Sequence, residues 1–255
     1  MSWYPRLLYL NRAKDATITS SAETTGYPDD NAVDWRDWLR WAAADTNTYW
    51  IKANYGSQVT ATALGLSGHN IYTNGARYKL DGSNNDADWT PIVAYITPDT
   101  DFTRVDFFTE VTYQYFRLTI DNNGGASFDL ELGLFFVGNY IEFPEVPDFP
   151  ADPDQQKDHS TRQRGESGRL LGIVNDWTER ATTWTINYLT QAWVSNTWLP
   201  YWTSYRFEPF IWVWDSVDHG TESYLMEWNM ETMNIPYNQV WRMPLTLEMR
   251  GVKEE

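Results

Sequence analysis

The sequence has 255 residues, enough for one large domain or two modest ones, each with its own core. It contains no cysteine, which excludes a disulfide framework, a thiolate nucleophile and cysteine-ligated zinc, and its three scattered histidines argue against a histidine-based metal site. The formal net charge of −16 argues against wrapping a nucleic-acid backbone, whereas 15 Trp and 16 Tyr favour β structure and wide contact surfaces.

The chain begins with an aromatic and aliphatic stretch, residues 1–10, which predicts a strand that could pair with either half of the chain. This stretch lacks the basic head, long apolar core and cleavage site of a signal peptide. No later run approaches the ~20 apolar residues of a membrane span. We therefore expect a protein that is made in the cytoplasm and is not inserted in a membrane.

Residues 11–139 predict an all-β sandwich, because short apolar runs alternate with frequent glycines. An early turn at Gly26-Tyr27-Pro28 has a defined shape, since Gly26 permits a positive φ and proline fixes its own φ. Residues 113–120 alternate apolar and more polar side chains with a period of two, as in a half-buried strand.

Four segments of this range resemble, in the same order, the discoidin family of F5/8 type C, galactose-binding-like β-sandwiches. Members show a hydroxyl-rich strand with Gly-Tyr-Pro and Asn-Ala-x-Asp-Gly motifs, a strand followed by a Trp, an Arg-Tyr-type strand and a closing Glu-Leu strand. The counterparts here are Ile18–Asp34, Arg77–Trp89, Tyr113–Ile120 and Leu130–Gly138. The resemblance implies a jelly-roll β-sandwich.

In carbohydrate-binding relatives, loops at one end of the sandwich present aromatic rings to sugar C–H groups and polar groups to hydroxyls. The resemblance implies such a platform just after the Asn-Ala-Val-Asp element. The predicted carbohydrate ligands are Trp35, Arg36, Trp38, Arg40 and Trp41. The alternative is that these aromatic side chains pack against a neighbouring subunit or the other domain.

Relatives often hold a structural calcium ion, which is therefore the one cofactor that the resemblance implies. Its carboxylate ligands would be Asp34 and Glu131. The sequence departs from the family pattern, because Trp35 stands where glycine is expected and the usual hydroxyl is missing. Ca²⁺ takes six to eight oxygen ligands. The alternative is that Asp34 caps backbone amides of its own loop.

No nucleophile elbow, HExxH motif, P-loop or dinucleotide fingerprint is present in the sequence. The acidic tracts Asp81–Asp88 and Asp99–Asp106 could imitate the carboxylate pair of a glycosidase, but such tracts usually form solvated turns. We therefore expect no enzymatic activity.

Residues 140–169 differ in character, since four prolines stand among acidic residues and a polar stretch follows. Proline at this spacing favours extended, semi-rigid backbone, so this range predicts a linker or an arm.

Residues 170–255 resume β patterning and predict a second β domain. Residues 183–188 alternate, residues 210–214 are continuously apolar, and residues 191–202 predict a short helix or an aromatic loop. Pro244 suits an edge strand. The last strand places its apolar side chains on one face: Trp241, Met243, Leu245, Leu247 and Met249.

The whole layout resembles the distal tail and tail-tip ring proteins of long-tailed bacteriophages, in which a β domain of tail-tube or belt type forms a ring, commonly six-fold. The resemblance implies a virion protein that assembles as a homo-oligomer with other tail proteins. The discoidin-like module would project outward, toward the rest of the tail or a host-surface glycan. The alternative is a free-standing carbohydrate-binding protein or an ancillary module of a glycosidase.

Overall fold

The computed structural model describes residues 4–36, 38–148, 152–164, 166–216, 222–230, 232–233 and 242–252. These residues belong to two compact units. The N-terminal unit consists of Arg6–Glu142 and Ile211–Tyr224. The C-terminal unit consists of Met1–Pro5, Phe143–Phe210 and Leu225–Glu255. Within the described ranges, no helix is long and apolar enough to cross a membrane.

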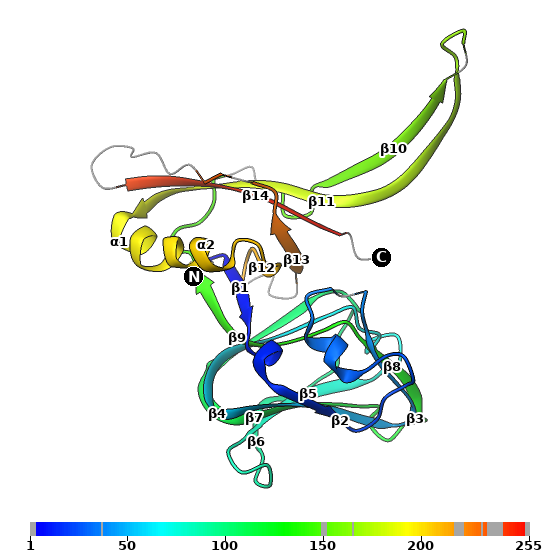
Figure 1. Ribbon diagram of the computed structural model, residues 1–255, viewed down its shortest axis with the longest axis vertical. Coiled ribbons are helices and arrows are strands. Elements are labelled where there is room, and N and C mark those ends of the chain that lie inside the picture. The colour runs from blue at the N-terminus through cyan, green and yellow to red at the C-terminus, as the bar shows by residue number, and fades with distance from the viewer. Residues whose placement is uncertain are drawn as a thin grey trace. The chain divides into compact units, whose positions relative to one another are not determined.

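The N-terminal unit is a β-sandwich, as predicted (Figure 1). Its larger sheet has the antiparallel order β12-β1-β9-β4-β7-β5-β6, with β2 added along β4, and its smaller sheet is the pair β3-β8. The elements are β1 (Arg6–Asn11), the 3₁₀ turn η1 (Arg12–Asp15), β2 (Thr17–Ser20), the 3₁₀ turn η2 (Asp29–Val33), β3 (Trp41–Thr46), β4 (Thr48–Ser67), β5 (Arg77–Ser83), β6 (Thr90–Ile96), β7 (Arg104–Asp121), β8 (Phe128–Leu132), β9 (Leu134–Glu142) and β12 (Phe210–Val213).

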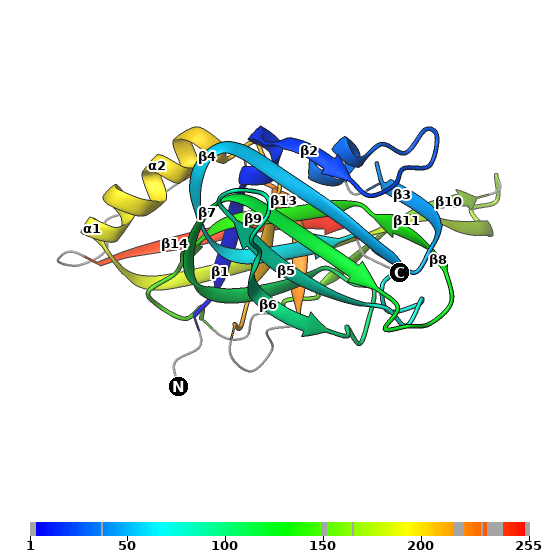
Figure 2. The same ribbon diagram turned by 90° about the horizontal axis from the view of Figure 1, so that it is seen from below.

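The two sheets enclose one apolar core. Strands β4 and β7 run side by side over most of their length, with β5 next to β7, as Figure 2 shows from below. The predicted alternation in residues 113–120 is confirmed, because Phe116, Leu118 and Ile120 are fully buried. The small sheet contributes Trp41, Leu130 and Leu132 to the same core. At about 25 cal/mol per Å² of apolar surface removed from water, these large side chains dominate the stability of the sandwich.

Strand β1 pairs with strands from both halves of the chain, whereas the sequence had left open which half it would join. It pairs with β9 on one side and with β12, from residues 210–213, on the other. The apolar run of β12 is buried at all four residues, so both faces of this strand are covered. Residues 1–3 of the predicted strand lie outside the described residues.

The C-terminal unit contains an antiparallel sheet of order β10-β11-β14-β13 and one helical segment. Its elements are β10 (Gln156–Arg164), β11 (Leu170–Thr190), α1 (Gln191–Trp193), the π-helical turn η3 (Val194–Trp198), α2 (Leu199–Tyr205), β14 (Arg242–Val252) and the larger part of β13 (Ser223–Trp228). Residues 156–164, which lie in the range predicted to be a proline-rich linker or arm, form a strand of this sheet.

The helical segment begins where Thr190 caps it, since the Thr190 hydroxyl accepts a hydrogen bond from Trp193 N at 3.2 Å. Its buried side chains follow the helical period at Val194, Trp198, Tyr201 and Trp202. A helix, rather than an aromatic loop, therefore forms here.

Strand β14 confirms the predicted alternation, because Met243, Leu245, Leu247 and Met249 are buried. Trp241, which was assigned to the same face, lies outside the described residues. The prediction of an edge strand was wrong, since β14 lies between β11 and β13. Pro244 is tolerated because the β11 register shifts opposite it and, among the described residues, β13 pairs with β14 at Met249 and Arg250.

Candidate functional site

The loop between β2 and β3, residues 21–40, folds back onto β3. Gly26 has φ +93°, as the predicted turn requires. Thr24 N donates to Ala42 O at 2.8 Å, and Ala42 N donates to Tyr27 O at 3.3 Å. Trp41 adds a third tie, because its Nε1 donates to Ala22 O at 3.0 Å. These hydrogen bonds to β3 therefore fix the conformation of the loop.

The three tryptophans of the predicted platform have different environments. Trp41 is fully buried and Trp35 is 7% exposed, with its ring 5.9 Å from that of Phe136. Trp38 is 68% exposed. The prediction that all three rings form one stacking surface was wrong for Trp35 and Trp41, because their faces are covered by the core of their own unit. They support the loop, and Trp38 projects from it.

The two arginines of the predicted platform both face carboxylates. Arg36 forms a two-pronged ion pair with Asp34, and hydrogen bonds from Arg36 lower the pKa of the Asp34 carboxyl. Arg36 N also donates to Asp34 Oδ1 at 3.0 Å, so Asp34 caps its own loop as the alternative prediction stated. Arg40 donates through Nη1 to Glu131 Oε2.

The residues at the predicted calcium position do not fit a calcium ion. Asp34 and Glu131 each have an arginine as their partner, and Ca²⁺ needs six to eight oxygens around it. Within the part of the chain that the structure describes, no group of three or more His, Asp or Glu side chains could hold a metal.

A cluster of three carboxylates lies within the same loop, and the sequence reasoning missed it. Asp29 N donates to Glu23 Oε1 at 3.2 Å, and Asp30 follows directly. Burial, together with the negative charge of Glu23 and Asp30, raises the pKa of Asp29. The available signal was the placing of acidic residues on both sides of Gly26-Tyr27-Pro28. Tyr27 itself is half exposed.

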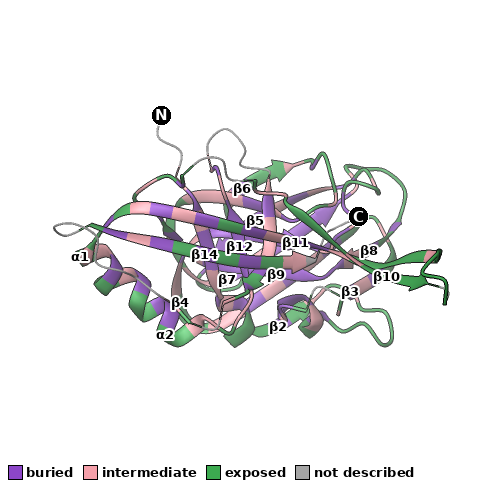
Figure 3. Cartoon of the chain, turned by 90° about the horizontal axis from the view of Figure 1, so that it is seen from above, coloured by how far each residue is buried: buried purple, intermediate pink, exposed green. Residues whose placement is uncertain are grey.

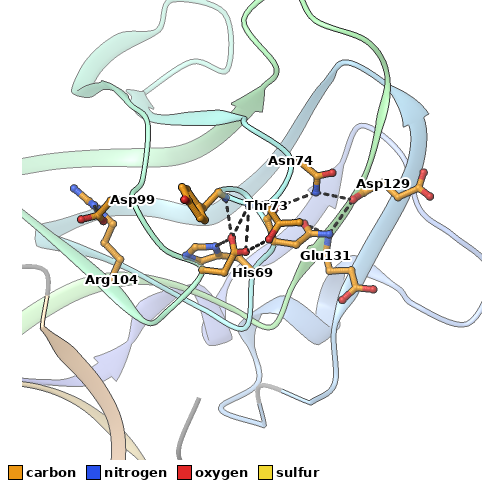
Figure 4. Close-up of polar contacts among 10 residues, drawn as sticks. His69, Thr73, Asn74, Asp99, Arg104, Asp129 and Glu131 are labelled. Atoms are coloured by element: carbon orange, nitrogen blue, oxygen red, sulfur yellow. Dashed lines mark hydrogen bonds and ion pairs between the residues drawn. The ribbon is translucent and has the colours of Figure 1, made fainter. Parts of the chain in front are cut away.

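A second loop, residues 68–76, packs along β8 (Figure 4). The Asn70 side chain hydrogen-bonds to the β8 backbone in the way that the backbone of an adjacent strand does. Its Nδ2 donates to Asp129 O at 2.9 Å, and its Oδ1 accepts from Glu131 N at 3.0 Å. Asn74 donates to Asn70 O at 2.8 Å and to Asp129 O at 3.3 Å. Glu131 thus links this loop to Arg40 of the first loop.

Asp101 fixes the tip of the second loop. It accepts hydrogen bonds from Tyr72 N at 2.7 Å and from the Thr73 hydroxyl at 2.5 Å, and Nδ1 of buried His69 lies 3.5 Å away. Burial alone would raise the pKa of Asp101, but His69 and the Thr73 and Tyr72 hydrogen bonds outweigh it and lower the pKa to about 2. Figure 4 also shows Arg104 beside Asp99, 3.6 Å apart.

The two acidic tracts supply ion pairs as well as solvated turns. Asp81 is 1% exposed and lies 2.9 Å from Lys79 Nζ. Asp106 accepts a hydrogen bond from the Tyr78 hydroxyl and lies 3.5 Å from Arg104. Burial raises the pKa of Asp106. Asp81 also lies 3.6 Å from Arg117, so both carboxylates link β5 with β7.

The solved structures similar to this chain include carbohydrate-binding modules of about half its length. Chitosan-binding module 1 of a chitosanase/glucanase from Paenibacillus sp. IK-5 is 26% identical over 51% of this chain and 98% of the module, with a TM-score of 0.44. Module 2 of that enzyme, in complex with chitotriose, is 23% identical over 49% of this chain and 96% of the module, with a TM-score of 0.42.

The module CpGH89CBM32-5 from Clostridium perfringens, in complex with GalNAc-β-1,3-galactose, is 13% identical over 50% of this chain and 98% of the module, with a TM-score of 0.42. A search of curated proteins found no match. The family model of the F5/8 type C domain matches residues 17–131. Residues 17–131 therefore form an F5/8 type C domain, with the discoidin-type jelly-roll fold that the motifs predicted.

Proposed function

We propose that residues 17–131 bind carbohydrate through the loop that carries Trp38. The observation that supports this most directly is the exposure of Trp38, because the neighbouring Trp35 of the same loop and Trp41 of β3 are buried. A large, rigid, exposed ring on a fixed loop offers contact area to a sugar at low entropic cost. The F5/8 type C match covers residues 17–131, which include this loop, and the family resemblance of the sequence implies a carbohydrate platform here.

The charge of the domain favours a hexosamine glycan. Residues 17–131 contain sixteen Asp and Glu against seven Lys and Arg, a net charge of −9. Glu23, Asp29 and Asp30 concentrate part of that charge within the loop itself. Such a surface repels polyuronates and attracts the ammonium group of glucosamine. The proposed ligand class is thus a linear glycan of glucosamine or N-acetylglucosamine.

Three hexasaccharides of different charge test the proposal by calorimetric titration of the full chain. We expect the glucosamine hexamer to bind more tightly than the N-acetylglucosamine hexamer, and the mannuronate hexamer to bind most weakly. Raising the salt concentration should reduce the differences in affinity among the three oligomers, because salt screens the interactions of exposed charges. The proposal is overturned if neither hexosamine oligomer binds, or if the mannuronate oligomer binds best.

Replacing Trp38 by alanine should weaken binding of the glucosamine hexamer about ten-fold or more, equivalent to ~1.4 kcal/mol. Trp177→Ala is the matched control, because Trp177 is 50% exposed but belongs to the C-terminal unit. That control should retain wild-type affinity. Equal losses in both variants would mean that the Trp38 loop is not the binding site.

We also propose a second candidate function, which is structural. In this proposal the chain assembles into the oligomeric ring of a bacteriophage tail tip, as the layout of the sequence implies. The observation that favours assembly is the hairpin β10–β11, which extends beyond the described end of β14 and is largely exposed over residues 156–164 and 170–177 (Figures 1 and 3). A two-stranded hairpin alone in water is marginally stable at best. A partner would therefore stabilise it.

The hairpin carries exposed apolar side chains on both of its faces. Ile173 and Val174 are neighbours, so they point to opposite faces, and each is more than half exposed. Leu171 is 70% exposed. Trp177 is half exposed, with one face stacked on His159 at a centroid distance of 3.9 Å. Grouped exposed apolar residues mark interaction surfaces.

The charge of the hairpin tip points to a second copy of this chain as the partner. Residues 160–174 contain three arginines and one glutamate, a net charge of +2. The remainder of the chain then carries −18, given the total of −16. A cationic, apolar tip is complementary to the acidic surface of another copy.

Sedimentation of the full chain should therefore show concentration-dependent association. Val174→Asp should shift the equilibrium toward monomer, because it places a carboxylate in the apolar contact. Phe207→Asp is the control, since Phe207 is 86% exposed outside the hairpin. The structural candidate fails if the wild-type protein stays monomeric at every concentration, or if both variants associate like the wild type.

A further inference from the structure

Two ion pairs hold the ends of the short segment that carries Trp38. At its start, Arg36 Nε donates to Asp34 Oδ1 at 3.0 Å and Arg36 Nη2 donates to Asp34 Oδ2 at 2.6 Å, a fork that fixes both groups. At its end, Arg40 Nη1 donates to Glu131 Oε2 on β8. Leu39 N donates to Arg36 O at 2.8 Å, which closes the turn between them.

Arg40 is held by its backbone as well as by its side chain. Asn31 Nδ2 donates to Arg40 O at 3.0 Å, and η2 thereby contacts the end of the segment. Glu131 is fixed in turn, because its N donates to Asn70 Oδ1 in the loop of residues 68–76. The Arg40–Glu131 pair thus joins three parts of the chain at one point.

The same two carboxylates are the ones that the discoidin resemblance assigned to calcium. Each now faces a guanidinium group, which supplies positive charge and fixed geometry without needing additional oxygen ligands. We infer that Arg36 and Arg40 take the place of a calcium ion in this chain, and that they are positioning residues which hold Trp38 ready for a ligand. The second part rests on the proposed carbohydrate site; the first part does not.

Both pairs are exposed, with side-chain exposures of 56% and 37% for Arg36 and Asp34, and of 46% and 43% for Arg40 and Glu131. Exposed ion pairs contribute little to global stability. Their effect should therefore be local. They should keep the Trp38 segment ordered and, by preorganising it, raise the affinity for a ligand. A local effect without a change in global stability distinguishes a positioning role of these arginines from a general stabilising role.

Hydrogen exchange of the full chain tests the arginine clamp without any ligand. In Arg40→Ala, amides in fragments covering Trp38–Trp41 should exchange about two- to five-fold faster, the change expected for an exposed ion pair. Arg77→Ala is the matched control, because it removes the 2.8 Å pair of Arg77 with Asp121 in the same unit. In the control, the Trp38–Trp41 fragments should exchange as in the wild type.

Calcium addition and EDTA should leave wild-type exchange in this segment unchanged. The inference is overturned if calcium slows exchange there, or if Arg40→Ala behaves like the wild type. Titration with the glucosamine hexamer adds a separate result: Arg40→Ala should bind about two- to five-fold more weakly with an unchanged melting temperature, and Arg40→Lys should recover part of the loss. If the wild type binds no hexamer but the exchange result holds, only the carbohydrate site is lost.

Discussion

Replacing Trp198 by alanine should destabilise the C-terminal unit by about 3–5 kcal/mol, the cost of removing a large aromatic side chain from a core. Trp198 is fully buried and lies at the centre of an aromatic cluster. Its ring centroid is within about 6 Å of those of Phe143, Trp193, Tyr201, Trp202 and Trp228. Its Nε1 also donates to Met233 Sδ at 2.7 Å. A cavity at this point removes contacts on every side.

Total domain stabilities are about 5–15 kcal/mol, so a loss of this size leaves a large unfolded fraction. Hydrogen exchange under mild denaturant resolves where it occurs: amides of β11 and β14 should lose protection in Trp198→Ala, while amides of β4 and β7 keep it. Phe207→Ala is the control, because Phe207 follows the same helical segment but is 86% exposed. If the amides of β11 and β14 are as well protected in Trp198→Ala as in Phe207→Ala, the aromatic cluster is not the core of this unit.

Strands whose side chains alternate between core and solvent were predictable from the sequence. Residues 116, 118 and 120 of β7 and residues 243, 245, 247 and 249 of β14 show the period of two because each strand has one buried face. The helix near Trp198 was ambiguous for a physical reason. Its buried positions follow a helical spacing, but Leu199 is apolar and exposed and Pro200 follows it, which blurs the pattern.

The hairpin β10–β11 could not be recognised from residues 156–164. A strand with both faces in solvent has no apolar alternation, so its composition matches that of a polar linker. Its pairing depends on β11, whose apolar residues were themselves predicted to belong to the next domain.

The loop that carries the candidate site was predictable in position, but the burial of its side chains was not. The Asn-Ala-Val-Asp motif located the loop, yet nothing in the local sequence separates exposed Trp38 from buried Trp35 and Trp41. Their burial depends on residues far along the chain, such as Phe136 for Trp35. The Arg40–Glu131 pair is likewise a contact across 91 positions, which only the fold brings together.

Asp101→Asn should destabilise the N-terminal unit by about 2 kcal/mol at neutral pH, since the folded protein lowers the pKa of this carboxyl from 3.8 to about 2. The amide is nearly the same size, but it brings an NH₂ group toward Tyr72 N, Thr73 N and the Thr73 hydroxyl, all of which donate. It also removes the negative charge beside His69. The loop of residues 68–76 would lose its fixed tip.

The pH dependence identifies the cause. Because the folded-state pKa is depressed, the carboxylate contributes its full stability above about pH 4, and that contribution is lost as the pH falls through about 2. The difference in unfolding free energy between wild type and Asp101→Asn should therefore shrink steadily from pH 4 to pH 2. Urea denaturation at several pH values measures it. Asp99→Asn is the control, because the Asp99 side chain is 73% exposed and its difference from wild type should stay near zero throughout. A difference for Asp101→Asn that does not change between pH 7 and pH 2 would show that the charge of Asp101 is not what holds the loop.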